Sequence, residues 1–138
     1  MVTYWDASVL VPLVVKEAST ARYLKIGQNG EIVTWWGSYL ECTSAIARLA
    51  HEGTAPADVA ASYRLLDQLA ARWREIGPSE QLRRAATRML KRHLLRTGDA
   101  LQLGAAIVAG GFEPETVHFL TEDLRLKAAA AREGFFVE

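Results

Sequence analysis

The sequence predicts an α/β fold, specifically a three-layer α/β/α sandwich around a small, mostly parallel sheet. Short runs rich in β-branched and aromatic residues alternate along the chain with longer segments whose apolar residues recur at helical spacing. Strands that are separated by helices pair in parallel through right-handed crossovers, and the helices then cover both faces of the sheet. The 138 residues match the size of one ordinary domain, so residues 1–138 are expected to fold as a single unit.

Each expected strand is a short apolar run bounded by residues typical of turns. The first run, VTYW, combines a β-branched residue with two aromatic ones and is expected to be buried. The expected strands occupy residues 2–5, 32–35, 73–76, 117–120 and 135–137. The strand at 73–76 is brief, and the last one follows Gly134.

The expected helices are separated from the strands by capping residues, glycine and proline. A first short helix tolerates Pro12 near its start. Ser19 is expected to cap the second helix, which Gly27 should end, and Ser79 is expected to cap a basic helix. Gly134 ends the last one. The expected helices occupy residues 9–16, 20–26, 39–51, 54–71, 80–93, 97–110 and 124–132.

The composition favours a cytoplasmic protein. Cys42 is the only cysteine, so an internal disulfide is impossible, which fits a reducing compartment. No apolar run approaches the roughly 20 residues of a membrane span. The N-terminus has no basic region before an apolar stretch, so no export signal is expected.

The neutral net charge conceals a basic block. Residues 72–96 contain eight lysine and arginine residues against two glutamates, a net charge of +6, so the rest of the chain carries −6. The cations from Arg83 to Arg92 have helical spacing, and two interpretations stay open: a solvated helix face, or a wall that neutralises RNA phosphates. Arg96 is the best single candidate for an RNA contact because it lies three residues before Asp99.

Four carboxylates are the candidate functional residues. Asp6 follows the first expected strand and Asp123 follows the fourth, so both belong at the carboxyl edge of the sheet, where open α/β sheets bind ligands. Asp99 lies near the start of a helix, where backbone N–H groups favour an anion, and Glu41 lies early in another helix. The four side chains are expected to converge on one crevice.

A divalent metal would resolve the repulsion within such a cluster. Like charges in a partly buried site raise one another's pKa, and a hard cation removes the problem. Mg²⁺ prefers oxygen ligands and Mn²⁺ suits the same set, whereas no histidine or cysteine cluster has the spacing of a zinc site. A metal held by carboxylates can activate water against a phosphodiester, so the expected chemistry is phosphodiester hydrolysis.

Simpler roles remain open for these residues. Each acid could act alone, with Asp6, Asp99 and Asp123 as helix caps and Glu41 as an ordinary surface acid. The hydroxyls of Ser8 and Thr121 could satisfy turns. The adjacent Trp35 and Trp36 should face opposite sides of a strand; core packing is the favoured role, with base stacking and a dimer surface as alternatives.

Four segments together resemble the PIN-domain nucleases. Each carries one of the acids, and their order and spacing match that family across nearly the whole chain. They are residues 2–10 (VTYWDASVL), 38–48 (SYLECTSAIAR), 95–106 (LRTGDALQLGAA) and 119–126 (FLTEDLRL). The size is closest to VapC-type toxins of toxin–antitoxin pairs, which are Mg²⁺-dependent endoribonucleases, held inactive by a cognate antitoxin and usually dimeric.

The resemblance implies a role for each matching residue. Asp6, Glu41 and Asp99 would be the principal metal-site acids, and Asp123 a fourth, more variable one. Two further positions, Ser8 and Thr121, would be polar supports. The chain departs from the common pattern with Gly98, where many relatives carry a bulkier residue, and with Gln102, where a histidine is common; both departures would alter substrate fit.

Two rival functions stay open beside the nuclease. The first is a PIN-like module that binds RNA or a protein without cutting, although a pure binder has no need of a repelling acidic cluster. The second is a small Mg²⁺-dependent phosphatase, but Ser8 stands where the aspartyl-nucleophile type carries a second Asp, and no Gly-rich phosphate loop is present. The sequence therefore favours an Mg²⁺-dependent endoribonuclease of the toxin type.

Overall fold

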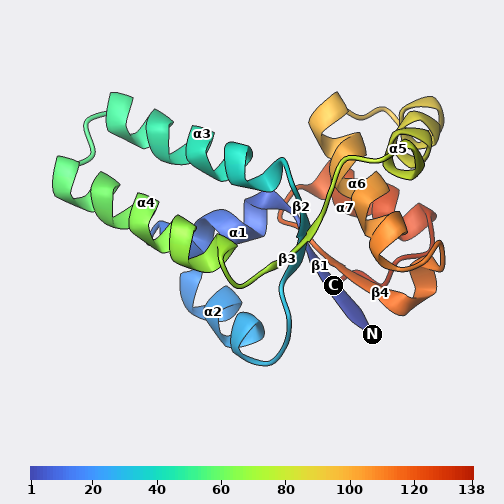
Figure 1. Ribbon diagram of the computed structural model, residues 1–138, viewed down its shortest axis with the longest axis horizontal. Helices are drawn as coiled ribbons and strands as arrows, with labels where there is room; N and C mark the ends of the chain where they lie inside the picture. Colours follow the sequence, from blue (N-terminus) through green and yellow to red (C-terminus); the bar gives the residue numbers. More distant parts are fainter.

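A four-stranded, all-parallel sheet forms the centre of the protein (Figure 1). The structure is a computed structural model that describes every residue from Met1 to Glu138. The strand order is β3-β2-β1-β4. The strands are β1 (Val2–Trp5), β2 (Val33–Trp35), β3 (Arg74–Ile76) and β4 (Val117–Leu120). Parallel pairing agrees with the predicted α/β sandwich, because every return between neighbouring strands runs through helices.

Helices cover both faces of this sheet, which gives three layers and confirms the predicted fold class (Figure 1). One apolar cluster joins the sheet to the first four helices, and a second joins it to the last three. No helix is both long and apolar enough to cross a lipid bilayer. The helices are α1 (Ala7–Val14), α2 (Thr20–Gln28), α3 (Ser38–His51), α4 (Pro56–Ala70), α5 (Glu80–Arg92), α6 (Thr97–Ala109) and α7 (Leu124–Arg132).

Strands β1 and β4 have buried side chains on both faces of the sheet. Tyr4 belongs to the cluster beneath α5, α6 and α7, whereas its neighbour Trp5 belongs to the cluster beneath α1 to α4. Phe119 and Leu120 of β4 divide between the clusters in the same way. Successive side chains of a strand point to opposite faces, so a continuous apolar run is what a doubly covered strand requires.

Several element ends differ from the sequence prediction. The first helix begins at Ala7, directly after Asp6, and ends at Val14. Gly27 lies inside α2 instead of ending it, and Ser19 occupies the N-cap position without a side-chain hydrogen bond to the helix. Residues 135–137 form no strand, contrary to the prediction, and make only a single parallel bridge, which joins Phe136 to His118.

Other predicted boundaries are confirmed. The hydroxyl of Ser79 accepts a hydrogen bond of 3.0 Å from the backbone N–H of Leu82 and so caps α5. Gly134 follows α7 with a φ of +96°, a backbone conformation that favours glycine. The expected start of α4 at residue 54 is two residues early, because Pro56 with its fixed φ is the first helical residue.

Helices α5 and α6 approach each other closely through Gly104. A Cβ atom at this position would lie 2.9 Å from the backbone nitrogen of Ala86. No flexible side chain is present there to move aside, so the absence of a side chain at Gly104 sets the distance between the two helices.

We predict opposite effects for two helical Gly→Ala substitutions. Gly104→Ala should lower the free energy of unfolding by about 1–3 kcal/mol, because the new methyl group meets backbone. Gly27→Ala is the matched control. Its Cβ would meet the Trp5 ring at an ordinary 3.6 Å, so the better helix propensity of alanine should raise stability by up to about 1 kcal/mol. Urea unfolding measures both; equal stabilisation would contradict the close approach.

Candidate active site

The register between β1 and β4 brings two loops together at the carboxyl edge of the sheet. Trp5 pairs with Leu120, so both strands end at the same level. The backbone N–H of Asp6 extends the pairing by donating to the carbonyl of Leu120 at 3.1 Å. Asp6 therefore lies beside Thr121, although 115 positions separate them in the sequence.

The Asp6 carboxylate is held by hydroxyl groups. It is 5% exposed, and its Oδ1 accepts the backbone N–H of Ser8 at 2.7 Å. The other oxygen, Oδ2, accepts the hydroxyls of Ser8, at 3.0 Å, and of Thr121. Ser8 and Thr121 thus stand where polar supports were expected. Asp6 also caps α1, so capping and membership of the acidic cluster are compatible roles.

Glu41 approaches the same edge from the next strand. It lies in the first turn of α3, which starts three positions after the end of β2. Its side chain is half-buried, and Oε2 accepts a hydrogen bond of 3.3 Å from the amide of Gln102. A Cβ atom at Gly98 would lie 3.7 Å from Glu41 Oε1. The Glu41 carboxylate therefore lies against the N-terminus of α6, and Gly98 leaves open space beside it.

Asp99 and Asp123 occupy helix N-termini at this edge. Asp99 lies in the first turn of α6 and is partly buried. Asp123 is exposed and caps α7, with Oδ1 accepting the backbone N–H of Leu126 at 3.0 Å. For Asp123 the capping role expected as an alternative is present in the structure, and its negative charge still raises the pKa of Asp99.

Burial and mutual repulsion make ionisation of these carboxyl groups costly. Burial raises the pKa of Asp6, and Asp99 raises it further, against the hydrogen bonds from Thr121 and Ser8. Burial also raises the pKa of Glu41 to about 7, with contributions from Asp6 and Asp99 against the hydrogen bond from Gln102. The acids therefore form one electrostatic cluster that extends from Glu41 through Asp6 and Asp99 to Asp123.

Two arginines lie at the rim of the cluster. Burial raises the pKa of Asp99, while the positive charges of Arg96 and Arg125 lower it. Arg96, the residue that the sequence analysis predicts to contact RNA, is exposed at the N-cap position of α6. Arg125, in the first turn of α7, was not anticipated. The ion pairs of the protein lie elsewhere, so neither arginine neutralises an acid by direct contact.

A buried polar network that sequence reasoning missed supports Glu41. Gln102, 1% exposed, accepts the hydroxyl of Tyr4 at 2.7 Å through Oε1. Its Nε2 donates to Ser38 Oγ at 3.0 Å and to Glu41 Oε2. The sequence contained a signal, because Gln102 lies one helical turn after Asp99 and Ser38 one turn before Glu41, so each shares a helix face with an acid.

The network has a single consistent direction of donation. Thr34 donates its hydroxyl to the carbonyl of Trp5 at 2.7 Å, so the 2.6 Å contact between Thr34 and Ser38 takes its proton from Ser38. Ser38 in turn accepts from Gln102. Every polar atom of the Gln102 amide is therefore used, and one amide orientation satisfies all partners.

The cluster offers oxygen donors to a hard cation, but not a complete cage. The structure contains no group of three or more His, Cys, Asp or Glu side chains placed so that together they could hold a metal ion. Mg²⁺ usually takes only one or two carboxylates and keeps several waters. Asp6 Oδ1 accepts one hydrogen bond and retains a second lone pair, so the donor set fits a partly hydrated Mg²⁺ or Mn²⁺.

We predict that Gln102→Leu lowers the free energy of unfolding by about 1–3 kcal/mol, since it leaves the buried Tyr4 hydroxyl without an acceptor. Adding Tyr4→Phe to that variant should cost less than Tyr4→Phe costs in the wild type. Gln68→Leu, on the exposed face of α4, is the matched control and should change stability by less than about 0.5 kcal/mol. Additive losses in urea unfolding would contradict the network.

A second prediction concerns pH. Because the folded-state pKa of Glu41 lies above its ordinary 4.5, the folded protein binds this proton more tightly than the unfolded chain does. Stability in EDTA should therefore fall as the pH rises from about 4.5 through about 7. Glu41→Gln should flatten that fall, and Glu52→Gln at the exposed end of the same helix should not. Identical slopes for both variants would refute the shift.

Comparison with known proteins establishes the fold alone. No protein-family model matches the chain, and no curated protein matches it. The chain is similar to the crystal structure of PAE2754 from Pyrobaculum aerophilum, with a TM-score of 0.67 and 21% sequence identity over 99% of this chain and 90% of the other. The α/β architecture and strand arrangement are thus found in a solved structure of nearly the same extent.

Proposed function

We propose that this protein is a metal-dependent endoribonuclease of the toxin type, with its active site at the carboxyl edge of the sheet. One observation carries the proposal: four acids from four places in the chain meet at this edge. Glu41 lies against the N-terminus of α6, which carries Asp99, and Asp6 is hydrogen-bonded to Thr121, which also accepts the backbone N–H of Asp123. Repelling, partly buried carboxylates cost folding free energy, and a function that needs their charge explains why they stand together.

A bound divalent cation would offset this repulsion. Asp6, Asp99 and Glu41 would be the carboxylates from which Mg²⁺ or Mn²⁺ takes the one or two protein ligands that are usual for it, with Asp123 at the outer side of the cluster. When bound, the ion supplies a water activated for attack and stabilises negative charge on a phosphodiester. The donor set supports this choice because it consists of carboxylate oxygens, which Mg²⁺ prefers.

The protein's own residues do the positioning. Ser8 and Thr121 fix the Asp6 carboxylate in one orientation, and the Gln102 amide does the same for Glu41. Because these two carboxylates are already oriented, they do not have to rearrange when a phosphate is attacked. Arg96 and Arg125 at the rim would attract the phosphate groups of the substrate. The choice of RNA among phosphodiesters rests on the motif resemblance to PIN-domain nucleases.

The same resemblance supports two further proposals: a cognate antitoxin holds the protein inactive, and the protein forms a homodimer. The proposal that it acts in the cytoplasm rests instead on its composition, with Cys42 as the only cysteine. Light scattering at micromolar concentration measures the oligomeric state, and a monomer mass would contradict the dimer.

We predict that the purified, antitoxin-free protein cuts a mixed tRNA and rRNA substrate into discrete fragments with Mg²⁺ and not with EDTA. Asp6→Asn should still fold, because asparagine also caps helices. It should cut RNA more than about 100-fold more slowly than the wild type. Losing a residue that only supports a metal ligand usually costs at most about 100-fold, so a larger loss identifies Asp6 as a ligand. Asp58→Asn, in the exposed first turn of α4, is the matched control and should retain full activity.

The control reactions separate the alternatives. Cleavage that survives both EDTA and Asp6→Asn would sink the metal-dependent mechanism. Folded protein that binds RNA but leaves it intact in Mg²⁺ and in Mn²⁺ would instead identify a non-cleaving binding module.

A further inference from the structure

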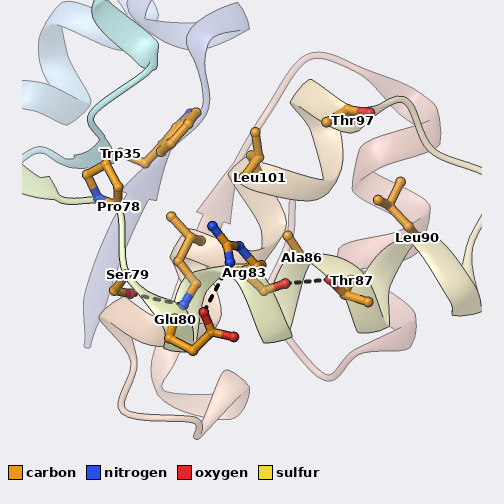
Figure 2. A pocket seen from close by; sticks show the side chains of 11 residues that line it. Trp35, Pro78, Ser79, Glu80, Arg83, Ala86, Thr87, Leu90, Thr97 and Leu101 are labelled. Atoms are coloured by element: carbon orange, nitrogen blue, oxygen red, sulfur yellow. Dashed lines mark hydrogen bonds and ion pairs between the residues drawn. The ribbon is translucent and has the colours of Figure 1, made fainter.

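A cleft of about 540 Å³ opens between the end of β2 and the helices α5 and α6 (Figure 2). Trp35 and Pro78 form one wall, and Leu101 of α6 faces Trp35 across the opening (Figure 2). Ala86 and Leu90 of α5 contribute to the opposite wall. The volume lies within the range of roughly 300–1,000 Å³ typical of small-molecule sites, and the walls expose mostly apolar surface with one aromatic ring, Trp35, which suits a flat apolar group.

The cleft adjoins the acidic cluster. Thr97 and Leu101 line it, and each lies two residues from Asp99 on α6. On the other wall, the indole Nε1 of Trp35 is buried without a hydrogen-bond partner. A polymer bound with one phosphate at the carboxylates would therefore place a neighbouring unit at the mouth of the cleft.

Gly37 gives the Trp35 ring its place. A Cβ atom at Gly37 would overlap the six-membered ring of Trp35, so the ring lies directly on the glycine backbone. Trp36, which contacts Trp35 edge to face at 6.4 Å between ring centroids, is 51% exposed and takes no part in the cleft. The prediction that the two tryptophans face opposite sides of a strand is wrong, because β2 ends at Trp35 and Trp36 lies in the turn that follows.

Cations continue from the cleft along α5. Arg83 and Thr87 line both the cleft and an adjoining hollow of about 390 Å³, whose other walls include Arg88 and Lys91. Arg83 pairs with Glu80 at 3.3 Å (Figure 2), but both side chains are largely exposed, so that pair is weak. Arg88 and Lys91 belong to none of the ion pairs.

We propose that the cleft is a subsite for one unpaired nucleobase of the RNA, which stacks on Trp35 beside the cleaved phosphate while neighbouring phosphates lie along the cations of α5. This subsite rests on the proposed nuclease function and adds to it a preference for single-stranded RNA. An aromatic wall next to a row of cations is the combination by which proteins bind single strands, because every base has a π face and every linkage a negative charge.

The charge of the cleft's surroundings favours RNA over a protein partner. The hollow beside the cleft is lined by four cations and no apolar residue, with Glu80 as its one acid. An apolar protein surface would leave these charges unpaired, whereas a nucleotide supplies the base and the phosphate together.

The test measures binding of a fluorescently labelled, single-stranded oligouridylate in EDTA, so that no cutting occurs. Removing the base at one position should weaken binding to the wild type about 5- to 150-fold, the usual effect of one stacked base. Trp35→Leu should weaken binding of the intact oligomer to a similar degree and abolish the effect of the missing base. Trp35→Phe should keep most of the base dependence. Trp36→Leu is the matched control and should change affinity by less than about twofold.

A second measurement needs no variant. The wild type is irradiated with an oligouridylate that carries 5-iodouridine at the sensitive position, and the cross-linked residue is found by mass spectrometry. A cross-link to Trp35 supports the subsite, and one to Trp36 or to no residue of the cleft overturns it. The subsite is also overturned if the missing base still weakens binding to Trp35→Leu. If Trp35→Leu instead converts a dimer to a monomer and the missing base has no effect on binding, the subsite is overturned and the cleft belongs to the interface with a second copy of the chain.

Parallel reactions with Mg²⁺ keep the two proposals apart. If the wild type cleaves RNA but the effect of the missing base does not depend on Trp35, the subsite alone is overturned. If that effect depends on Trp35 but no RNA is cleaved in Mg²⁺ or Mn²⁺, the cleft is supported as an RNA contact and the nuclease is overturned.

Discussion

Parallel pairing of β1 with both of its neighbours is the constraint on which the rest of the structure depends. Strand β1 lies between β2 and β4, and all three run in the same direction. Parallel neighbours cannot be joined by a tight turn, so every connection crosses a face of the sheet through helices. Both faces are therefore covered, and all strands end at one edge. This edge of the sheet therefore also contains Asp6, Thr121 and the first turn of α3.

The acidic edge is stabilised by local hydrogen bonds and opposed by its own charge. Hydroxyl groups satisfy Asp6, and a buried amide satisfies Glu41. These bonds favour the ionised forms, yet burial outweighs them and the pKa of both groups is raised. The polar network that extends from Tyr4 to Thr34 joins β1, β2, α3 and α6, so the groups that orient Glu41 also lie within the core. Stability and site geometry are thus coupled through the same side chains.

Helix α5 has two different faces with two different tasks. Its buried residues pack on α6, where Gly104 permits close approach, and this packing brings one wall of the Trp35 cleft into place. Its exposed face carries the cations of the basic block, which the sequence left open between a solvated face and an RNA wall. The contacts of Arg83 and Arg84 with Glu80 fit the first interpretation, and continuity with the cleft supports the second.

The sequence by itself determined the fold class and the chain positions of the four acids. Local patterns suffice for this, because strand and helix periodicity is read within a few residues, and an acid after a parallel strand must lie at the carboxyl edge. Only the tertiary structure decided which side chains meet. Gln102 reaches Glu41 across 61 positions, and Trp35 lines a cleft with Leu101, because packing of α6 beside β2 brings distant segments together. The last expected strand is only one bridge, because a strand depends on pairing with a neighbour and not on local propensity alone.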